Sequence, residues 1–475
     1  MAEVALERER GSALERWFHL TARGTDVGTE VRAGLTTFMV MSYIIIVNPV
    51  ILTTGATIAG LDVSFPAVVT STCLVAALMT LAMGWWANVP FALAPGLGIN
   101  AVVAFQLMVG LKYTFAEAMG VILLEGLIIT ILVLTGLRQR VLHALPVALK
   151  LAIGAGIGLF IFAIGAYEAG FYTVPLGATQ GGTVAPPTAG VLGNFTAAPV
   201  IYAVLGLLLT TYLMHARVKG AILIGILATT LIGVIVHLAL RVPLSVVPGK
   251  LELAGSLLSA PDFRYVGIGV LGLGFLTKGG GGLILAGILA VLSIMLSDFF
   301  DTAGTFTALG SEASLVDDEG NLRENEDRAY VVDSLGALMG GVVGSSSATT
   351  YIESAAGIAE GGRTGLTSVV TAIPFVIAMV FANVFAIVPQ EATAGALMVV
   401  GVLMLAAVGS EIPWRDFSLA LPALFTLMLM PLTWSITNGI AGGVVLYTLL
   451  NWRHAGVVLW VLSVAFVLYV VLGTK

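Results

Sequence analysis

The chain consists of long, continuously apolar runs separated by short polar or glycine-rich stretches. Runs of about 17–25 apolar residues have the length that an α-helix needs to cross the hydrocarbon core of a bilayer. Every backbone N–H and C=O needs an internal partner in lipid, which restricts spanning structures to helices and closed barrels. A barrel strand would alternate apolar and polar residues, and these runs do not alternate. The pattern predicts an all-α polytopic membrane protein.

The apolar runs fall into two sets of spans with a polar segment, 241–282, between them. The first set lies within 31–240, at 31–52, 66–86, 91–109, 114–137, 148–167, 198–215 and 219–240. The second lies within 283–452, at 283–309, 330–344, 348–361, 365–388, 392–410, 416–433 and 435–452. We expect 1–30 to be a cytoplasmic tail and 241–282 to lie on the opposite side. The C-terminal segment 453–475 holds a further run, 455–473, that either spans the bilayer or lies against the bundle.

Two spans in matching places of the two sets are interrupted. The third contains Pro90, Pro95, Gly96 and Gly98, and the tenth is short and opens with the hydroxyl-rich stretch 345–350. Each pattern predicts a short extended segment that leads into a half-helix. Paired interrupted segments of this kind mark the binding site of transporters built from inverted repeats. We therefore expect about fourteen helices as a 7+7 inverted repeat, with broken helices 3 and 10.

Composition and charge agree with this architecture. The chain is 58% hydrophobic and 10% charged, whereas soluble domains carry about a quarter charged residues. The single Cys73 excludes a disulfide framework and a cysteine metal cluster. With the N-terminus inside, most Lys and Arg of the short loops fall on the cytoplasmic side, as the positive-inside rule requires. These features predict a multi-pass protein of the cytoplasmic membrane with a cytoplasmic N-terminus.

Carboxylates within apolar spans are the sharpest chemical signal. Asp298 and Asp301 lie in the eighth span, where an acidic residue costs about 2.5–3.5 kcal/mol on insertion scales. Their i, i+3 spacing places both on one face of the helix. Neighbouring hydroxyls could satisfy them, but two acids on one face favour a functional role. Glu125, in the fourth span, is either a proton-relay group or a packing carboxylate.

The broken spans carry two further polar candidates. Glu353 follows the hydroxyl-rich stretch, where a half-helix begins with free N–H groups and a positive dipole end. It could stabilise that end structurally, or face a polar ligand together with the free amides. Asn100 lies beside the Pro/Gly break of the third span and could bind a ligand or join two helices. Asp333, near the start of the ninth span, is expected to cap that helix.

The chemistry of these residues points to a class of cargo. Several carboxylates repel anions but accept hydrogen bonds from the ring N–H and amino groups of a nucleobase. The aromatic rings of Phe299 and Tyr351 offer stacking faces. A carboxylate kept from water can take up a proton and so couple transport to proton flow. The sequence lacks a nucleotide-binding P-loop, and we expect no cofactor, no metal, no nucleic-acid partner and no enzymatic activity.

Four stretches of the chain resemble a known family: EVRAGLTTFMVMSYIIIVNP, PFALAPGLGINAVVAF, SDFFDTAGTFTALGSEASLVD and GSSSATTYIESAAGIAEGGRTGLTS. They are similar to the AzgA-like hypoxanthine/adenine/guanine permeases of the nucleobase–cation symporter 2 group, and the resemblance extends from about 20 to 472. It implies a 7+7 inverted repeat divided into core and gate domains. It also implies proton symport of purine bases by an elevator-type movement, and a possible homodimer formed through the gate.

The resemblance also assigns residues. Asn100, Asp298 and Glu353 match purine-binding positions, and Asp301 matches a second acidic position used in recognition or coupling. Tyr351-Ile352-Glu353 matches a Tyr-x-Glu element that contacts the base in related uracil carriers, where the middle residue is Gly. We add Ala94, Ile352 and Phe299 to the expected binding residues. The expected proton-coupling residues are Asp298, Asp301, Glu353 and Glu125.

Competing hypotheses remain open at this stage. A small-anion transporter or a uracil/xanthine transporter could use the same fold. The anion hypothesis requires a cationic group at a half-helix start, and Arg363 lies at the cytoplasmic end of the tenth span instead. An ion channel would require a continuous polar stripe, and an intramembrane enzyme a metal cluster or a Ser/Lys pair. The sequence displays neither of these patterns.

Overall fold

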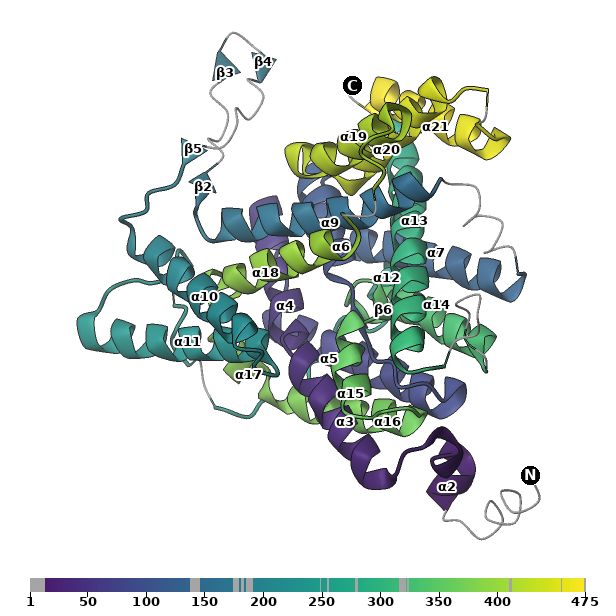
Figure 1. Ribbon diagram of the computed structural model, residues 1–475. Helices are drawn as coiled ribbons and strands as arrows, with labels where there is room; N and C mark the ends of the chain where they lie inside the picture. The colour runs from purple at the N-terminus through teal and green to yellow at the C-terminus, as the bar shows by residue number, and fades with distance from the viewer. Residues whose placement is uncertain are drawn as a thin grey trace, which may run out of the picture.

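The computed structural model describes most of the chain. The described residues are 13–136, 146–173, 179–180, 183–184, 191–247, 249–253, 256–277, 281–315, 322, 324–409, 412–453 and 455–473. The two halves of the chain intertwine in one helical body, with the N-terminal and C-terminal helices at opposite ends (Figure 1).

The described helices follow the apolar runs closely. Those of the first half are α2 (Ala13–Phe18), α3 (Val27–Met41), α4 (Ile44–Ala59), α5 (Phe65–Ala82), α6 (Leu97–Ala101), α7 (Phe115–Leu134), α9 (Val147–Glu168), α10 (Ala198–His215) and α11 (Ala221–Leu240). Those of the second half are α12 (Ile268–Gly272), α13 (Gly281–Glu312), α14 (Glu326–Val343), α15 (Ala355–Ala359), α16 (Gly365–Ala378), α17 (Ala382–Phe385), α18 (Gln390–Gly409), α19 (Phe417–Thr433), α20 (Ile436–Leu450) and α21 (Val457–Gly473). Two π-helical segments, Met83–Ala87 and Val102–Gly110, extend α5 and α6.

Helix length and composition support a membrane protein. Seven of the described helical stretches are long and apolar enough to cross a bilayer, and shorter apolar helices accompany them. The prediction of an all-α polytopic membrane protein is confirmed. The helix α21 packs against α20 and α13, so the C-terminal apolar run joins the bundle. The helix α3 already begins within the tail that we expected at 1–30.

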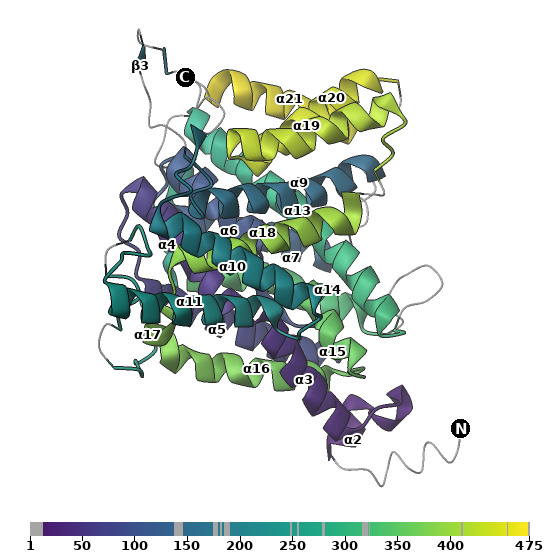
Figure 2. The ribbon, with the colours of Figure 1, turned by 60° about the vertical axis from the view of Figure 1, so that its left-hand side comes forward.

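The helices form two groups. In what we call the core group, α7 packs on α14, and α16 packs on α3 and α5. In the gate group, α9 packs on α18 and α19, and α10 packs on α11 and α18. Figure 2 shows α19, α20 and α21 stacked beyond α9 and α18, with α16 on the far side of the molecule. The helix α13 contacts both groups through α7 and α9.

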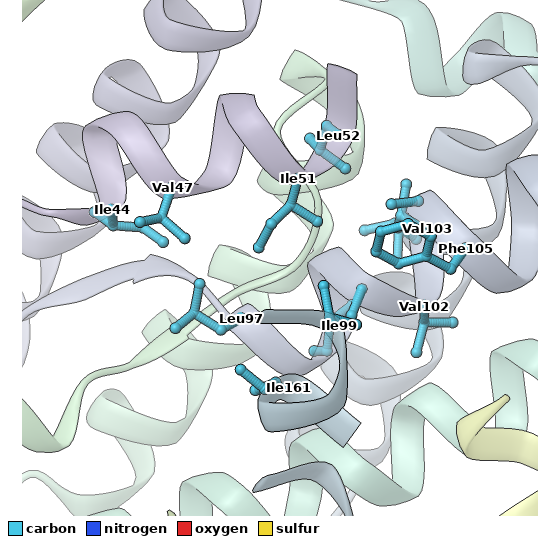
Figure 3. Packing of buried hydrophobic residues seen from close by; sticks show 14 of the residues in the cluster. Ile44, Val47, Ile51, Leu52, Leu97, Ile99, Val102, Val103, Phe105 and Ile161 are labelled. Atoms are coloured by element: carbon cyan, nitrogen blue, oxygen red, sulfur yellow. The ribbon is translucent and has the colours of Figure 1, made fainter. Parts of the chain in front are cut away.

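Apolar side chains fill the seam beside the third span. Ile44, Val47 and Ile51 of α4 face α6 and the π-helical segment that follows it (Figure 3). Ile161 of α9 approaches from the gate group (Figure 3). This seam is apolar and buried. The polar residues of the third and tenth spans therefore lie beside an apolar surrounding.

Local sequence explains where several helices begin. The Thr114 hydroxyl accepts a hydrogen bond from Glu117 N while the Glu117 carboxylate accepts one from Thr114 N, which forms a capping box at the start of α7. The Asp26 carboxylate accepts hydrogen bonds from Gly28 N and Thr29 N and caps α3. The Thr29 hydroxyl and backbone lower the pKa of Asp26. Each cap satisfies N–H groups that a helix start leaves free.

The connecting segment 241–282 contains the helix α12, which packs against α7 and α14. A Cβ at Gly272 would overlap the Ala116 carbonyl oxygen, and the missing side chain allows this close approach. This part of the segment is therefore built into the core group. A run rich in glycine gives no hydropathy signal for such a short helix.

Candidate functional site

Two short extended segments meet in the core group. The strand β1 (Leu93–Pro95) of the third span pairs antiparallel with β6 (Ala348–Thr350) of the tenth, with Ala94 opposite Thr349. Gly96 N donates to Ser347 O over 2.9 Å, and Tyr351 N donates to Ala92 O over 2.9 Å. This pairing satisfies backbone groups that the interrupted helices cannot satisfy.

Asp333 holds β6 in place. Its Oδ1 accepts hydrogen bonds from Thr350 N (2.9 Å) and the Thr350 hydroxyl (2.7 Å), and its Oδ2 accepts one from the Thr302 hydroxyl (2.6 Å). The expectation that Asp333 caps a helix is wrong, because α14 begins at Glu326 and Asp333 lies in its interior. The helix starts earlier than its apolar run, since a polar turn precedes that run.

The two acids of α13 have different surroundings. Asp298 is 3% exposed and accepts a long hydrogen bond of 3.4 Å from the Ser347 hydroxyl, while its Oδ1 has no partner. Asp301, one turn further on, is exposed. Glu125 of α7 is fully buried, faces Asp298 and Ser347, and has no hydrogen-bond partner on either oxygen. The carboxyl groups of Glu125 and Asp298 therefore lie together out of solvent.

Glu353 lies on the accessible side of β6. The Tyr43 hydroxyl, at the junction of α3 and α4, donates a 2.6 Å hydrogen bond to Glu353 Oε1. Glu353 is partly exposed, and its charge interacts with that of Asp301. Ile352 beside it is 50% exposed, whereas Tyr351 is buried and donates to Pro95 O over 2.5 Å.

The remaining predicted residues are buried. Asn100 in α6 is inaccessible, and neither Oδ1 nor Nδ2 has a partner. Ala94 is inaccessible within β1. Phe299 is 2% exposed and packs in the hydrophobic core. Asn100 thus has free hydrogen-bonding capacity, whereas Phe299 is engaged in helix packing in this conformation.

Sequence reasoning missed two residues that this site uses, Tyr43 and Ser347, and gave a third, Asp333, the wrong role. Tyr43, Ser347 and Asp333 contact predicted residues or fix the backbone beside them. Tyr43 lies in an otherwise apolar run, and a lone tyrosine there gives no signal of a partner far along the chain. Ser347 is one of several adjacent hydroxyl residues, and the sequence does not distinguish it from its neighbours.

The fold resembles that of solved membrane transporters. The transmembrane domain of the cyanobacterial bicarbonate transporter BicA aligns with a TM-score of 0.57 at 17% identity, over 86% of this chain and 97% of that one. Murine Solute Carrier 26 family member A9, an anion transporter, aligns with a TM-score of 0.59 at 12% identity, over 90% of this chain and 68% of that one. These similarities concern the fold alone, and they confirm the predicted fold class of an all-α membrane protein with core and gate parts.

Sequence comparison identifies the family. The model of the Permease family (Xan_ur_permease) matches residues 28–442, so the chain belongs to that family. The guanine/hypoxanthine permease PbuG of Bacillus subtilis is 34% identical, over 96% of this chain and 99% of that protein. The adenine permease AdeQ of Escherichia coli is 36% identical, over 97% of this chain and 96% of that protein. The predicted resemblance is confirmed: the chain is a multi-pass membrane transporter and not an enzyme.

Proposed function

We propose that this transporter imports purine nucleobases, namely adenine, guanine and hypoxanthine, across the cytoplasmic membrane. Relatives that cover nearly the whole chain are named as permeases for these bases. The observation that carries the proposal is the placement of Glu353 and Asp301, two accessible carboxylates beside the paired β1 and β6. They offer the acceptors that the N–H groups of a purine require.

The site residues take distinct parts in this proposal. Glu353 uses Oε1 for Tyr43, and its other oxygen is available for a ring N–H of the base. Asn100 can both donate and accept, which suits a purine edge that carries an acceptor next to a donor. Ile352 exposes an apolar surface against which a flat ring can pack. Ala94, Tyr351 and Phe299 shape the surroundings from buried positions.

Transport in this proposal is driven by a proton gradient and proceeds by movement of the core group against the gate group. The polar contacts between the groups are found at separate points. Gln106 Nε2 donates to the Thr437 hydroxyl over 2.6 Å. Lys219 of the α10–α11 turn forms an ion pair with Glu360 at the end of α15. A largely apolar interface lets two rigid groups slide without breaking many hydrogen bonds. The N-terminus lies on the cytoplasmic side in this scheme.

A small-anion transporter is the alternative that the solved relatives of the same fold raise. The site argues against it, because Asp298, Asp301 and Glu353 would repel an anion. A uracil or xanthine carrier is an alternative closer in chemistry to a purine carrier. It is disfavoured by Ile352, which stands where related uracil carriers have Gly.

Uptake by proteoliposomes tests these proposals. Purified protein is reconstituted and supplied with radiolabelled adenine, guanine, hypoxanthine, uracil, xanthine and bicarbonate, with and without an inside-alkaline pH gradient. We expect accumulation of at least one of adenine, guanine and hypoxanthine above equilibrium only with the gradient. Gradient-driven uptake of bicarbonate or uracil alone would contradict the proposal, as would purine uptake that needs Na⁺ and ignores pH.

A further inference from the structure

Two stretches of the chain cross between the gate group and the core group side by side. The first is the connecting segment, which leaves α11 of the gate group and leads to α12 of the core group. The second joins α17, which packs on α5 of the core group, to α18 of the gate group. Val246 N of the first donates to Glu391 Oε1 of the second over 2.8 Å. Lys250 Nζ donates to Ala386 O over 2.9 Å.

The two contacts lie on opposite sides of the boundary between the groups. Glu391 is in the first turn of α18, so its contact with Val246 belongs to the gate group. Ala386 follows α17, and the Lys250 ammonium also lies 4.9 Å from the ring centroid of Phe65, the first residue of α5. The contacts of Lys250 therefore belong to the core group. Both stretches pass from one group to the other between these contacts, at 246–250 and 386–391, and they run antiparallel.

Buried neighbours hold the connecting segment at this point. Leu244 and Leu251 are 7% and 3% exposed and pack in the hydrophobic core, whereas Val246 between them is 65% exposed. Leu251 has a φ of 70°, in the left-handed region that side chains with a Cβ rarely adopt. Such a backbone persists only where surrounding contacts impose it. The position of Lys250 is therefore fixed by its neighbours as well as by its own hydrogen bond.

Further along, the connecting segment is bound to the core group. Its hydrogen bonds there join Asn383 Nδ2 to Ser256 O (3.0 Å), Ser259 N to Val380 O (2.9 Å) and Asp262 N to Thr70 Oγ1 (3.0 Å). When the core group moves, this part of the segment moves with it. The change in position between the groups then falls on the two short stretches that Lys250 and Glu391 tie together.

We propose that Lys250 and Glu391 are positioning residues for the transport movement, because they hold 246–250 and 386–391 together as one hinge between core and gate. The inference rests on the proposed movement of the two groups and does not depend on which base is carried. A few residues between rigid groups absorb the backbone change of such a movement. Two stretches tied at both ends restrict that change to fewer directions than two independent linkers would.

The opposite charges of the two residues suit this role. Glu391 is 1% exposed, its Oε2 has no hydrogen-bond partner, and its charge interacts with that of Lys250. The ammonium is on the core side and the carboxylate is on the gate side, so their attraction acts across the boundary between the groups. A cation over the Phe65 ring adds a second attraction on the core side.

Uptake kinetics test whether the hinge serves transport. Lys250→Met removes the ammonium and keeps an unbranched apolar side chain. We expect the maximal rate of purine uptake to fall at least about fivefold, while equilibrium purine binding stays within about threefold of wild type. Lys250→Arg keeps the charge and should recover most of the lost rate. Lys112→Met, at an exposed lysine, is the control and should transport like the wild type.

A distance measurement tests the hinge without any substrate. In a Cys73→Ser background, spin labels are attached at Asp62→Cys, before α5 of the core group, and at Thr196→Cys, before α10 of the gate group; both positions are exposed. Pulsed electron paramagnetic resonance gives the distribution of distances between the labels. We expect Lys250→Met to broaden this distribution and Lys112→Met to leave it unchanged.

An unchanged distance distribution in Lys250→Met overturns the inference, and so does an unchanged maximal rate. A larger loss of purine affinity in the folded variant also overturns it, because Lys250 would then act at the substrate. If Lys250→Met does not fold, Glu391→Gln is measured by the same criteria, since it keeps an acceptor for Val246 N and removes the charge. Failure of the wild type to transport any purine refutes the proposed function, whereas the label distances still decide the hinge.

Discussion

The Tyr43 hydroxyl donates a 2.6 Å hydrogen bond to Glu353 Oε1 and so connects the first helices of the chain to the tenth span. A hydrogen bond to a charged group contributes about 1.5–3 kcal/mol. Tyr43 fixes the orientation of the carboxylate, and in the proposed function its second oxygen binds the purine. The substitution Tyr43→Phe removes only the donor and preserves the ring.

We expect Tyr43→Phe to raise the KM for purine uptake roughly tenfold while kcat changes little, because a reoriented carboxylate weakens binding. Initial uptake rates over a range of purine concentrations measure both constants. Tyr212→Phe is the control, since Tyr212 is 66% exposed on α10. An unchanged KM in Tyr43→Phe would show that Glu353 does not depend on this contact.

Asp333 joins α14 to the extended segment of the tenth span, with three hydrogen bonds from Thr302 and Thr350. Asp333→Asn replaces one acceptor oxygen by a donor and leaves the Thr302 or Thr350 groups unsatisfied. We expect the apparent melting temperature to fall by several degrees, as a loss of roughly 2 kcal/mol implies. Asp327→Asn, at an exposed position of the same helix, should melt like the wild type; equal melting of both variants would refute the scaffolding role.

Glu30 has a corresponding structural role where α3 meets the start of α16. It is fully buried, and it accepts hydrogen bonds from Arg363 N (2.8 Å), Thr367 N (3.0 Å) and the Thr367 hydroxyl (2.6 Å). These contacts tie the start of α16 to α3. Glu30→Gln should lower thermal stability while the purine affinity of the folded fraction stays within about threefold of wild type. A large loss of affinity without a loss of stability would place Glu30 in the binding site instead.

The movement of core against gate can be tested at the Gln106–Thr437 contact. Cys73 is buried, and Cys73→Ser provides a background without reactive thiols. Gln106 lies in the π-helical segment that packs on α7 of the core group, and Thr437 lies in α20, which packs on α19 and α9 of the gate group. We therefore expect a thiol cross-link between Gln106→Cys and Thr437→Cys to stop uptake, and a reductant to restore it. A cross-link between Thr448→Cys and Ser463→Cys, whose hydroxyls lie 2.9 Å apart on α20 and α21, should leave uptake intact. Full uptake by the cross-linked Gln106/Thr437 pair would contradict the elevator movement.

Much of the architecture could be predicted from the sequence because bilayer thickness sets the length of an apolar run. The predicted span 198–215 coincides with α10, and 416–433 differs from α19 by one residue. One exception is α12, a short helix in a glycine-rich segment whose burial depends on α7 and α14. Hydropathy reports contact with lipid and does not detect a segment that is covered by protein.

Only one part of the site could be predicted from the sequence, namely the acidic residues within apolar spans. Asp298, Asp301 and Glu353 were recognised because charge in lipid is costly wherever it occurs. The contact between Tyr43 and Glu353 joins residues 310 positions apart, and a single sequence carries no information about such a pair. The burial of Asp298 and the exposure of Asp301, one turn apart on α13, likewise depend on tertiary packing.

Equilibrium binding of radiolabelled purine to the purified protein tests the central claim most directly. The claim is that the accessible carboxylate of Glu353, beside the paired β1 and β6, recognises a purine. We predict saturable binding of adenine, guanine or hypoxanthine to the wild type, weakened at least about 100-fold in a folded Glu353→Gln variant. Binding of equal strength to the wild type and to Glu353→Gln would contradict the account.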